Sequence, residues 1–182
     1  MRKIKLYIAV SLDGYIATPD GGIDWLNEIP NPTHEDHGYN ALLASVDTVL
    51  MGGRTYHEII GFGVPWPYKD KQTYVISRNN TNVTPNEKVE FITENIYREI
   101  AALKAQEGKD IWLVGGGELT TMLLNHDLID EMQIAVVPTI LGEGLPLFPN
   151  KPKESKWKLA DSKSFNSGII LLIYCKESLT LQ

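Results

Sequence analysis

The chain of 182 residues carries a formal net charge of −6, with 43% apolar and 22% charged residues and a single cysteine. Its length fits one domain, residues 1–182, with a sizeable buried core, and its acidic balance disfavours a nucleic-acid surface. Because no apolar run reaches the roughly 20 residues of a membrane helix and no cleavable leader is recognisable, we expect a cytoplasmic protein that contacts neither nucleic acid nor membrane.

The N-terminal half alternates predicted strands with polar segments. Residues 3–10 predict a strand that enters the centre of a sheet, because polar-apolar alternation gives way to a continuous apolar run. A polar segment follows over residues 18–38. A loop of this length in a compact domain is usually either functional or disordered, and Trp25 favours an ordered one. The other predicted elements of this half are one helix end and three strands, at residues 39–45, 47–51, 72–77 and 88–92.

The C-terminal half begins with a predicted helix over residues 94–106, for which Thr93 is a plausible N-cap. The strands that follow are predicted at residues 111–114, 131–137, 156–163 and 168–176, and the last two form a hairpin. Strands alternate with helices in the first two thirds of the chain, whereas strand follows strand at its end. The sequence therefore predicts an α/β domain with a central, mostly parallel sheet flanked by helices and a C-terminal antiparallel hairpin.

Two of the predicted strands run through glycines directly into a helix. Gly115, Gly116 and Gly117 follow one strand, and Gly52 and Gly53 follow another. Glycine lets another group approach the backbone closely, and a helix start offers free N–H groups and a partial positive charge, so an anion such as a phosphate suits each turn. The spacing matches neither the Rossmann nor the Walker pattern, and a tight turn that binds nothing is the alternative interpretation.

Neighbouring side chains narrow the choice of anion. Arg54 and Thr55 add a fixed cation and a hydroxyl donor to the first turn of the helix that follows Gly53. A third strand ends in Ser77 and Arg78, where a site for NAD would offer a carboxylate to the ribose. A serine beside an arginine suits a 2′-phosphate, so the pattern favours NADP over NAD.

Four stretches, 8–17 (IAVSLDGYIA), 49–56 (VLMGGRTY), 74–78 (YVISR) and 114–119 (VGGGEL), resemble the dihydrofolate-reductase-like superfamily in order and spacing. Residues 128–131 and the loop 138–148 are similar to its branch related to the reductase domain of riboflavin biosynthesis, the RibD C-terminal domain family. The resemblance spans nearly the whole chain. It implies a dihydrofolate-reductase-like fold and NADPH as the cofactor, and it makes a homodimer possible.

The resemblance also implies a set of cofactor-binding residues. The first strand near Ala9, together with Ile16, would receive the nicotinamide; the two glycine turns would hold the phosphates; and Ser77 and Arg78 would lie by the 2′-phosphate. Gly115-Gly116 is a candidate for a cis peptide bond. The implied cofactor-binding residues are Ala9, Ile16, Gly52, Gly53, Arg54, Thr55, Ser77, Arg78, Gly115, Gly116, Gly117, Glu118 and Leu119.

A catalytic residue is harder to assign from the sequence. In dihydrofolate reductase a carboxylate lies ahead of the Met-Gly turn, and the corresponding count leads to Asp36, with His34, Glu35 and His37 as competitors. We therefore predict Asp36 as a catalytic and substrate-binding residue, and Asp13 and Trp25 as further substrate contacts. The H-x-x-H spacing invites a metal interpretation, but no downstream cluster completes a site, so we expect no metal.

These features together predict an NADPH-dependent reductase that transfers hydride to a small heterocyclic substrate. The resemblance favours a substrate of the ribosylaminopyrimidine type, as in riboflavin biosynthesis, or a pterin. True dihydrofolate reduction is an alternative, and so is a protein that binds NADPH or a pterin without turnover. The loop over residues 18–38 is expected to cover the substrate ring.

Overall fold

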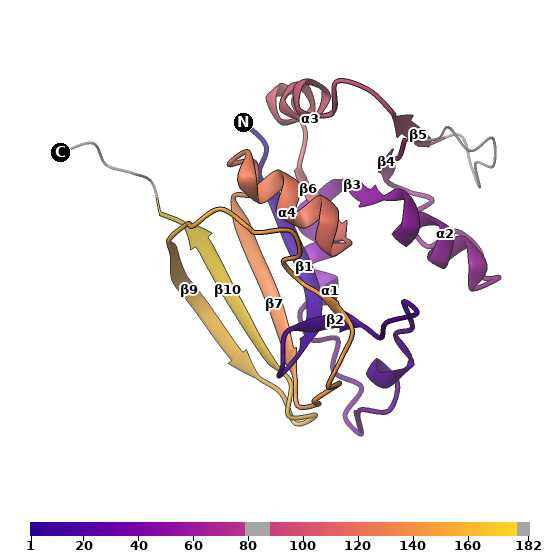
Figure 1. The fold of residues 1–182 in the computed structure, drawn as a ribbon, viewed down its shortest axis with the longest axis vertical. Helices are drawn as coiled ribbons and strands as arrows, with labels where there is room; N and C mark the ends of the chain where they lie inside the picture. The colour runs from indigo at the N-terminus through magenta and orange to yellow at the C-terminus, as the bar shows by residue number, and fades with distance from the viewer. Residues whose placement is uncertain (79–87, 178–182) are drawn as a thin grey trace.

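The computed structural model describes residues 1–78 and 88–177. In this part of the chain an eight-stranded sheet has the order β5-β4-β3-β6-β1-β7-β10-β9 (Figure 1). The strands from β5 to β7 are parallel, and β10 and β9 are antiparallel to their neighbours. The mostly parallel sheet and the C-terminal antiparallel hairpin both confirm the predicted α/β fold. The strands are β1 (Ile4–Ser11), β3 (Val46–Gly52), β4 (Gln72–Ile76), β5 (Val89–Ile92), β6 (Asp110–Gly115), β7 (Glu131–Val137), β9 (Trp157–Ser164) and β10 (Ile170–Lys176).

Four α-helices lie between these strands in the described residues: α1 (Tyr39–Ser45), α2 (Gly53–Gly61), α3 (Ile96–Ala105) and α4 (Gly117–Asn125). The prediction of Thr93 as the N-cap of α3 is wrong. The cap is Asn95, whose φ of 50° lies in the left-handed region that asparagine tolerates better than most residues. No described helix is long and apolar enough to cross a bilayer.

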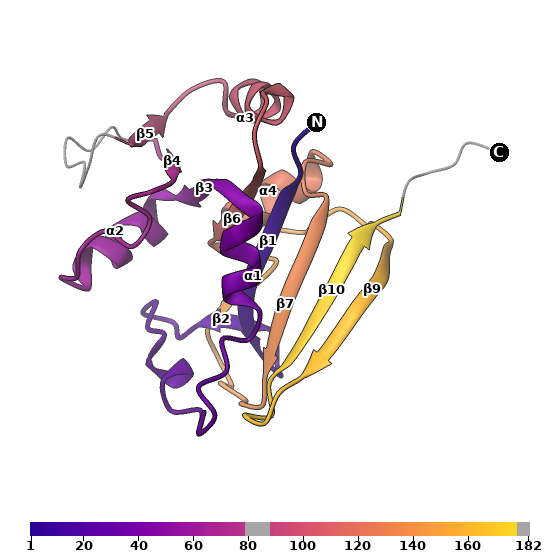
Figure 2. The same cartoon turned by 180° about the vertical axis from the view of Figure 1, so that it is seen from behind.

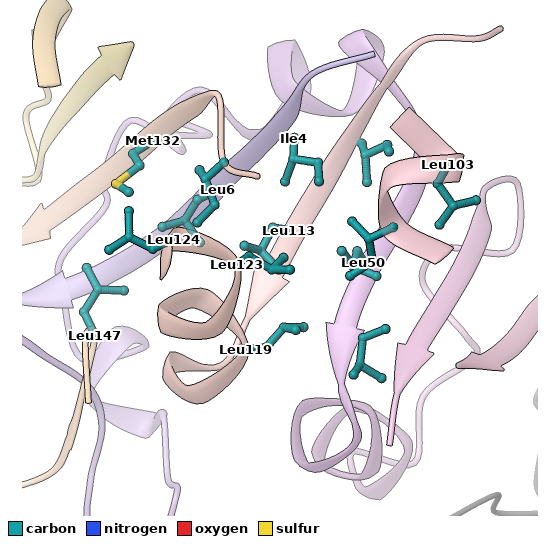
Figure 3. Packing of buried hydrophobic residues seen from close by; sticks show 14 of the residues in the cluster. Ile4, Leu6, Leu50, Leu103, Leu113, Leu119, Leu123, Leu124, Met132 and Leu147 are labelled. Carbon is teal, nitrogen blue, oxygen red and sulfur yellow. The ribbon is translucent and has the colours of Figure 1, made fainter. Parts of the chain in front are cut away.

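Helices cover both faces of the sheet. Figure 1 shows α4 in front of the central strands, and Figure 2, from behind, shows α1 in front of β1. One core lies under α3 and α4, where Leu123 of α4 lies beside Leu113 of β6 (Figure 3), and Leu119 and Leu6 belong to the same cluster. A second core lies under α1 and α2, and a third joins the 23–29 segment to β7 and β10. Strands buried on both faces explain the apolar runs in the sequence.

A second, two-stranded sheet pairs β2 (Tyr15–Ala17) with β8 (Leu145–Pro146). The two segments are short and lie far apart in the sequence, so no local pattern predicts their pairing. Gly144 makes the approach possible, because a Cβ there would lie 2.3 Å from the carbonyl oxygen of Ala17. This small sheet brings the 138–149 loop beside the carboxyl end of β1.

Candidate cofactor and substrate site

The connections that leave β3 and β6 diverge at the carboxyl edge of the sheet. From β3 the chain passes through α2 to β4, its neighbour on one side, whereas from β6 it passes through α4 to β7, beyond β1 on the other side. The two helices cover opposite faces, α2 in the second core and α4 in the first. Adjacent strands with diverging connections leave a crevice at their carboxyl ends, which is where open α/β sheets bind ligands.

Both glycine turns lie at this crevice. Gly52 is the N-cap of α2 and Gly116 that of α4, and neither helix start has a side-chain cap. A Cβ on Gly52 would lie 3.8 Å from the carbonyl oxygen of Gly115 and 3.9 Å from the nitrogen of Gly116. The Gly115-Gly116 peptide bond is cis, as the resemblance implied. Two helix starts without side-chain caps thus lie side by side, an arrangement suited to one ligand with two phosphates.

Side chains from three other elements border the two turns. A Cβ on Gly116 would lie 3.6 Å from Oγ1 of Thr55 on α2 and 4.0 Å from Cδ1 of Ile16 on β2. A Cβ on Gly53 would lie 3.0 Å from Oγ of Ser77, which directly follows β4. The structure therefore gathers, at one edge of the sheet, residues that lie up to 100 positions apart in the sequence.

The remaining predicted cofactor residues differ in what they can offer. Arg54 and Arg78 are exposed, in the first turn of α2 and just after β4. Leu119 is only 6% exposed and belongs to the core, so it can offer a ligand only its backbone. Glu118 is exposed, and its carboxylate would repel a phosphate, which again leaves the backbone N–H. Ala9 is half-buried on β1, paired with Ala135 of β7.

Asp13, predicted as a substrate contact, joins two loops in the structure. Its carboxylate accepts hydrogen bonds from the backbone N–H groups of Leu141 (3.1 Å) and Gly142 (2.7 Å) and from Oγ of Ser11 (2.6 Å). The bond from Ser11, followed by the two backbone bonds, holds the pKa of the Asp13 carboxyl below its usual range. Asp13 therefore fixes the 138–149 loop beside β2, a structural role that the sequence did not predict.

Trp25, the other predicted substrate contact, is a core residue. It lies in a 3₁₀ turn (Asp24–Leu26), is 6% exposed, and packs in the cluster of Val137, Phe165 and Leu171. Its indole N–H has no hydrogen-bond partner among the described residues. The 18–38 loop is thus ordered around a buried Trp25, whose indole nitrogen is buried as well.

Asp36, predicted as catalytic, lies at the start of α1. Its carboxylate accepts hydrogen bonds from the N–H groups of Asn40 (2.9 Å) and Gly38 (3.1 Å), and these bonds lower its pKa. A general acid works best with a pKa near the working pH, so the geometry favours a capping role over a catalytic one. Two of its three competitors are held by the β9–β10 turn: His37 forms a hydrogen bond with Oγ of Ser167 (2.9 Å), and Glu35 accepts one from the backbone N–H of Asn166.

Glu58 lies beside the 18–38 loop, and the sequence reasoning missed it. It lies one turn beyond Thr55 on α2, and a Cβ on Gly21 of the 18–38 loop would lie 2.9 Å from its Oε1. Burial raises the pKa of the Glu58 carboxyl, and the charge of Arg54 opposes the rise. The Arg54–Glu58 spacing of four on a predicted helix was the available signal.

Tyr7 links β1 to the same loop and should make stability pH-dependent. Its hydroxyl donates to the carbonyl oxygen of His37 (3.1 Å), and burial, aided by the charge of Asp36, raises its pKa to about 12. In the unfolded chain the Tyr7 hydroxyl loses its proton near pH 10, whereas in the folded protein it keeps the proton up to about pH 12. The contribution of this hydroxyl to the unfolding free energy is therefore complete below pH 10 and is lost as the pH rises through about 12.

We expect Tyr7→Phe to flatten the fall of the unfolding free energy between pH 10 and 12, measured by urea denaturation at each pH. Tyr97→Phe, at an exposed tyrosine, is the control and should leave the fall unchanged. If the unfolding free energy fell equally in wild type and Tyr7→Phe, Tyr7 would not be the source of the pH dependence.

Three comparisons with known proteins found chains similar to this one. Residues 64–171 match the family model of the RibD C-terminal domain. The chain is 41% identical to the uncharacterised protein YwjB of Bacillus subtilis over 93% of this chain and 96% of that one. It is 25% identical to the riboflavin biosynthesis protein RibD of Corynebacterium ammoniagenes over 78% of this chain but only 44% of that one. A crystal structure from Shewanella sp. PV-4, provisionally assigned to riboflavin biosynthesis, superposes with a TM-score of 0.87 at 34% identity, covering 97% of this chain and 99% of that one.

Proposed function

The chain belongs to the RibD C-terminal domain family, and from this we propose that it is an NADPH-dependent reductase that transfers hydride to a small heterocyclic substrate. The observation that carries the proposal is the pair of helix starts without side-chain caps at the β3–β6 crevice, with Gly52 and Gly115 in near contact. An arginine and a serine follow the next strand, β4, where a 2′-phosphate would lie.

The residues of the crevice fit this cofactor. The first-turn N–H groups of α2 and α4, with Arg54, would hold the diphosphate, and Ser77 with Arg78 would hold the 2′-phosphate. Ala9 and Ile16 would border the nicotinamide. NADPH supplies the hydride when bound, so this chain has to supply only orientation, exclusion of water and a proton.

The substrate would lie between the nicotinamide position and the 18–38 loop. We propose a ribosylaminopyrimidine-type ring, on the strength of the family and of the resemblance to riboflavin biosynthesis proteins. Glu58, with its raised pKa, can keep a proton to a higher pH than an ordinary glutamate, which suits a proton source at this edge.

Oxidation of NADPH against a panel of substrates tests the proposal. Absorbance at 340 nm is followed by stopped flow after mixing the NADPH complex with ribosylaminopyrimidines, dihydropterins, dihydrofolate or quinones. Oxidation by a ribosylaminopyrimidine supports the proposal. Oxidation by dihydrofolate alone would indicate a true dihydrofolate reductase, and tight NADPH binding with no oxidation by any compound would indicate a non-catalytic binding protein.

Variants at Asp36 separate capping from catalysis. Asp36→Asn keeps an acceptor for the α1 start, so we expect a hydride-transfer rate within about twofold of wild type from pH 6 to 9. Asp36→Ala should lose about 1 kcal/mol of unfolding free energy, the usual cost of a lost helix cap. A tenfold slower rate in Asp36→Asn, with both variants folded, would restore the catalytic role.

A further inference from the structure

A cavity of about 460 Å³ lies away from the glycine turns. It is bounded by the C-terminal end of α4, by β7, β10 and β9, and by the 148–157 segment, which crosses in front of the hairpin in Figure 1. Leu124, which lines it, is seven residues beyond Gly117, or about 10 Å along the helix. Figure 3 shows Leu124 beside Met132 of β7 at this end of α4. No residue predicted for the cofactor or substrate lines this cavity.

The walls of the cavity are aromatic and aliphatic. Phe148, Trp157 and Tyr174 contribute three half-buried rings, and Met132 and Ile134 of β7 form the apolar floor. The indole N–H of Trp157 donates to Oγ of Ser155 (2.9 Å), so its polar atom is already satisfied and its ring is free to make apolar contacts. A concave site of this size with such a lining suits a small ring compound.

The 148–157 segment that borders the cavity is basic, although the protein as a whole is acidic: it carries Lys151, Lys153 and Lys156 against one acid, Glu154. Lys153 lines the cavity, and Lys151 and Lys156 of the same segment form no ion pair with any described residue. Lys153 and Lys176 share a single carboxylate, that of Asp127, at 2.7 and 2.8 Å. One carboxylate cannot neutralise two ammonium groups, and Glu154 is the only acid among the lining residues. An anionic group on the ligand would therefore be favoured over a cationic one.

We propose that this cavity is a binding site for a small aromatic monoanion. Its ring system lies among Phe148, Trp157 and Tyr174, and its carboxylate or sulfonate points toward Lys153. The proposal does not depend on the reductase activity, because no lining residue belongs to the crevice.

Fluorescence titration with 8-anilinonaphthalene-1-sulfonate tests the proposal on the full chain, with saturating NADPH present throughout so that the crevice is occupied if it binds the cofactor. We expect one saturable site that 2-naphthoate displaces, whereas neutral 2-methylnaphthalene displaces the probe at least about tenfold less well. Ile134→Trp, which fills the apolar floor of the cavity, should lower the affinity for the probe at least about tenfold. Lys153→Glu should lower the affinity for the probe about five- to tenfold. Lys69→Glu, at an exposed lysine that does not line the cavity, should leave this affinity unchanged.

Several results would overturn the proposal. One is unchanged probe affinity in both Ile134→Trp and Lys153→Glu, and another is equal displacement by the neutral and anionic naphthalenes. A third is a dimer, detected by analytical ultracentrifugation, that excludes the probe and dissociates in Ile134→Trp, because a second copy of the chain would then be the occupant. Circular dichroism identifies a misfolded variant, and if Ile134→Trp fails to fold, Lys153→Glu still decides the outcome.

Discussion

Replacing Arg78 with alanine should weaken NADPH binding about 10- to 100-fold and leave NADH binding within about twofold. Arg78 is exposed and directly follows Ser77, which lies against Gly53 at the start of α2. A guanidinium can hold a 2′-phosphate through two charge-assisted hydrogen bonds, each stronger than a neutral one. NADH lacks this phosphate, so the loss should be selective.

Isothermal titration of both cofactors to wild type and Arg78→Ala measures the selectivity. Arg98→Ala, at an exposed arginine of α3, is the matched control for the loss of one positive charge and should leave both affinities unchanged. Equal losses for NADPH and NADH in Arg78→Ala would show that Arg78 acts on something other than the 2′-phosphate.

A methyl group at Gly52 should also block the cofactor, without unfolding the protein. The backbone of Gly52, with φ −79° and ψ 157°, is accessible to any residue, and the new Cβ would make only ordinary contacts of 3.8 to 4.0 Å. That Cβ would nevertheless occupy space between the two glycine turns, where a diphosphate has to approach the backbone. We expect NADPH affinity to fall about 10- to 100-fold, as for the loss of one or two charge-assisted hydrogen bonds.

Gly61→Ala is the matched control for this substitution. Gly61 ends α2, and a Cβ there would meet nothing within 4 Å, so the variant should fold and bind NADPH as the wild type does. Thermal unfolding and NADPH titration are measured for both variants. If Gly52→Ala kept its stability and its full NADPH affinity, the cofactor could not lie between the two turns.

The part of the site that the sequence predicted is the part formed by local patterns. Apolar strand, glycines and helix follow one another within a few residues at Gly52 and at Gly115, and parallel strands necessarily bring their carboxyl ends to one edge. The order of β4, β3, β6 and β1 then places Ser77, the two turns and Ala9 along that edge. Such patterns need no knowledge of distant contacts.

The roles that the sequence did not reveal depend on partners far along the chain. Asp13 is saturated by the N–H groups of Leu141 and Gly142, about 130 residues away. Trp25 is buried by residues of β7 and β10, and the 460 Å³ cavity forms only where α4, the hairpin and the 148–157 segment meet. No periodicity or spacing in the sequence reveals contacts between such distant segments, so the structural roles of Asp13 and Trp25 could not be predicted.

A crystal structure of the protein with NADPH tests the central claim most directly. We predict the diphosphate against the first-turn N–H groups of α2 and α4 and the 2′-phosphate within hydrogen-bond distance of Ser77 and Arg78. NADPH bound elsewhere, or no NADPH at millimolar concentration with the β3–β6 crevice open to solvent, would contradict the account.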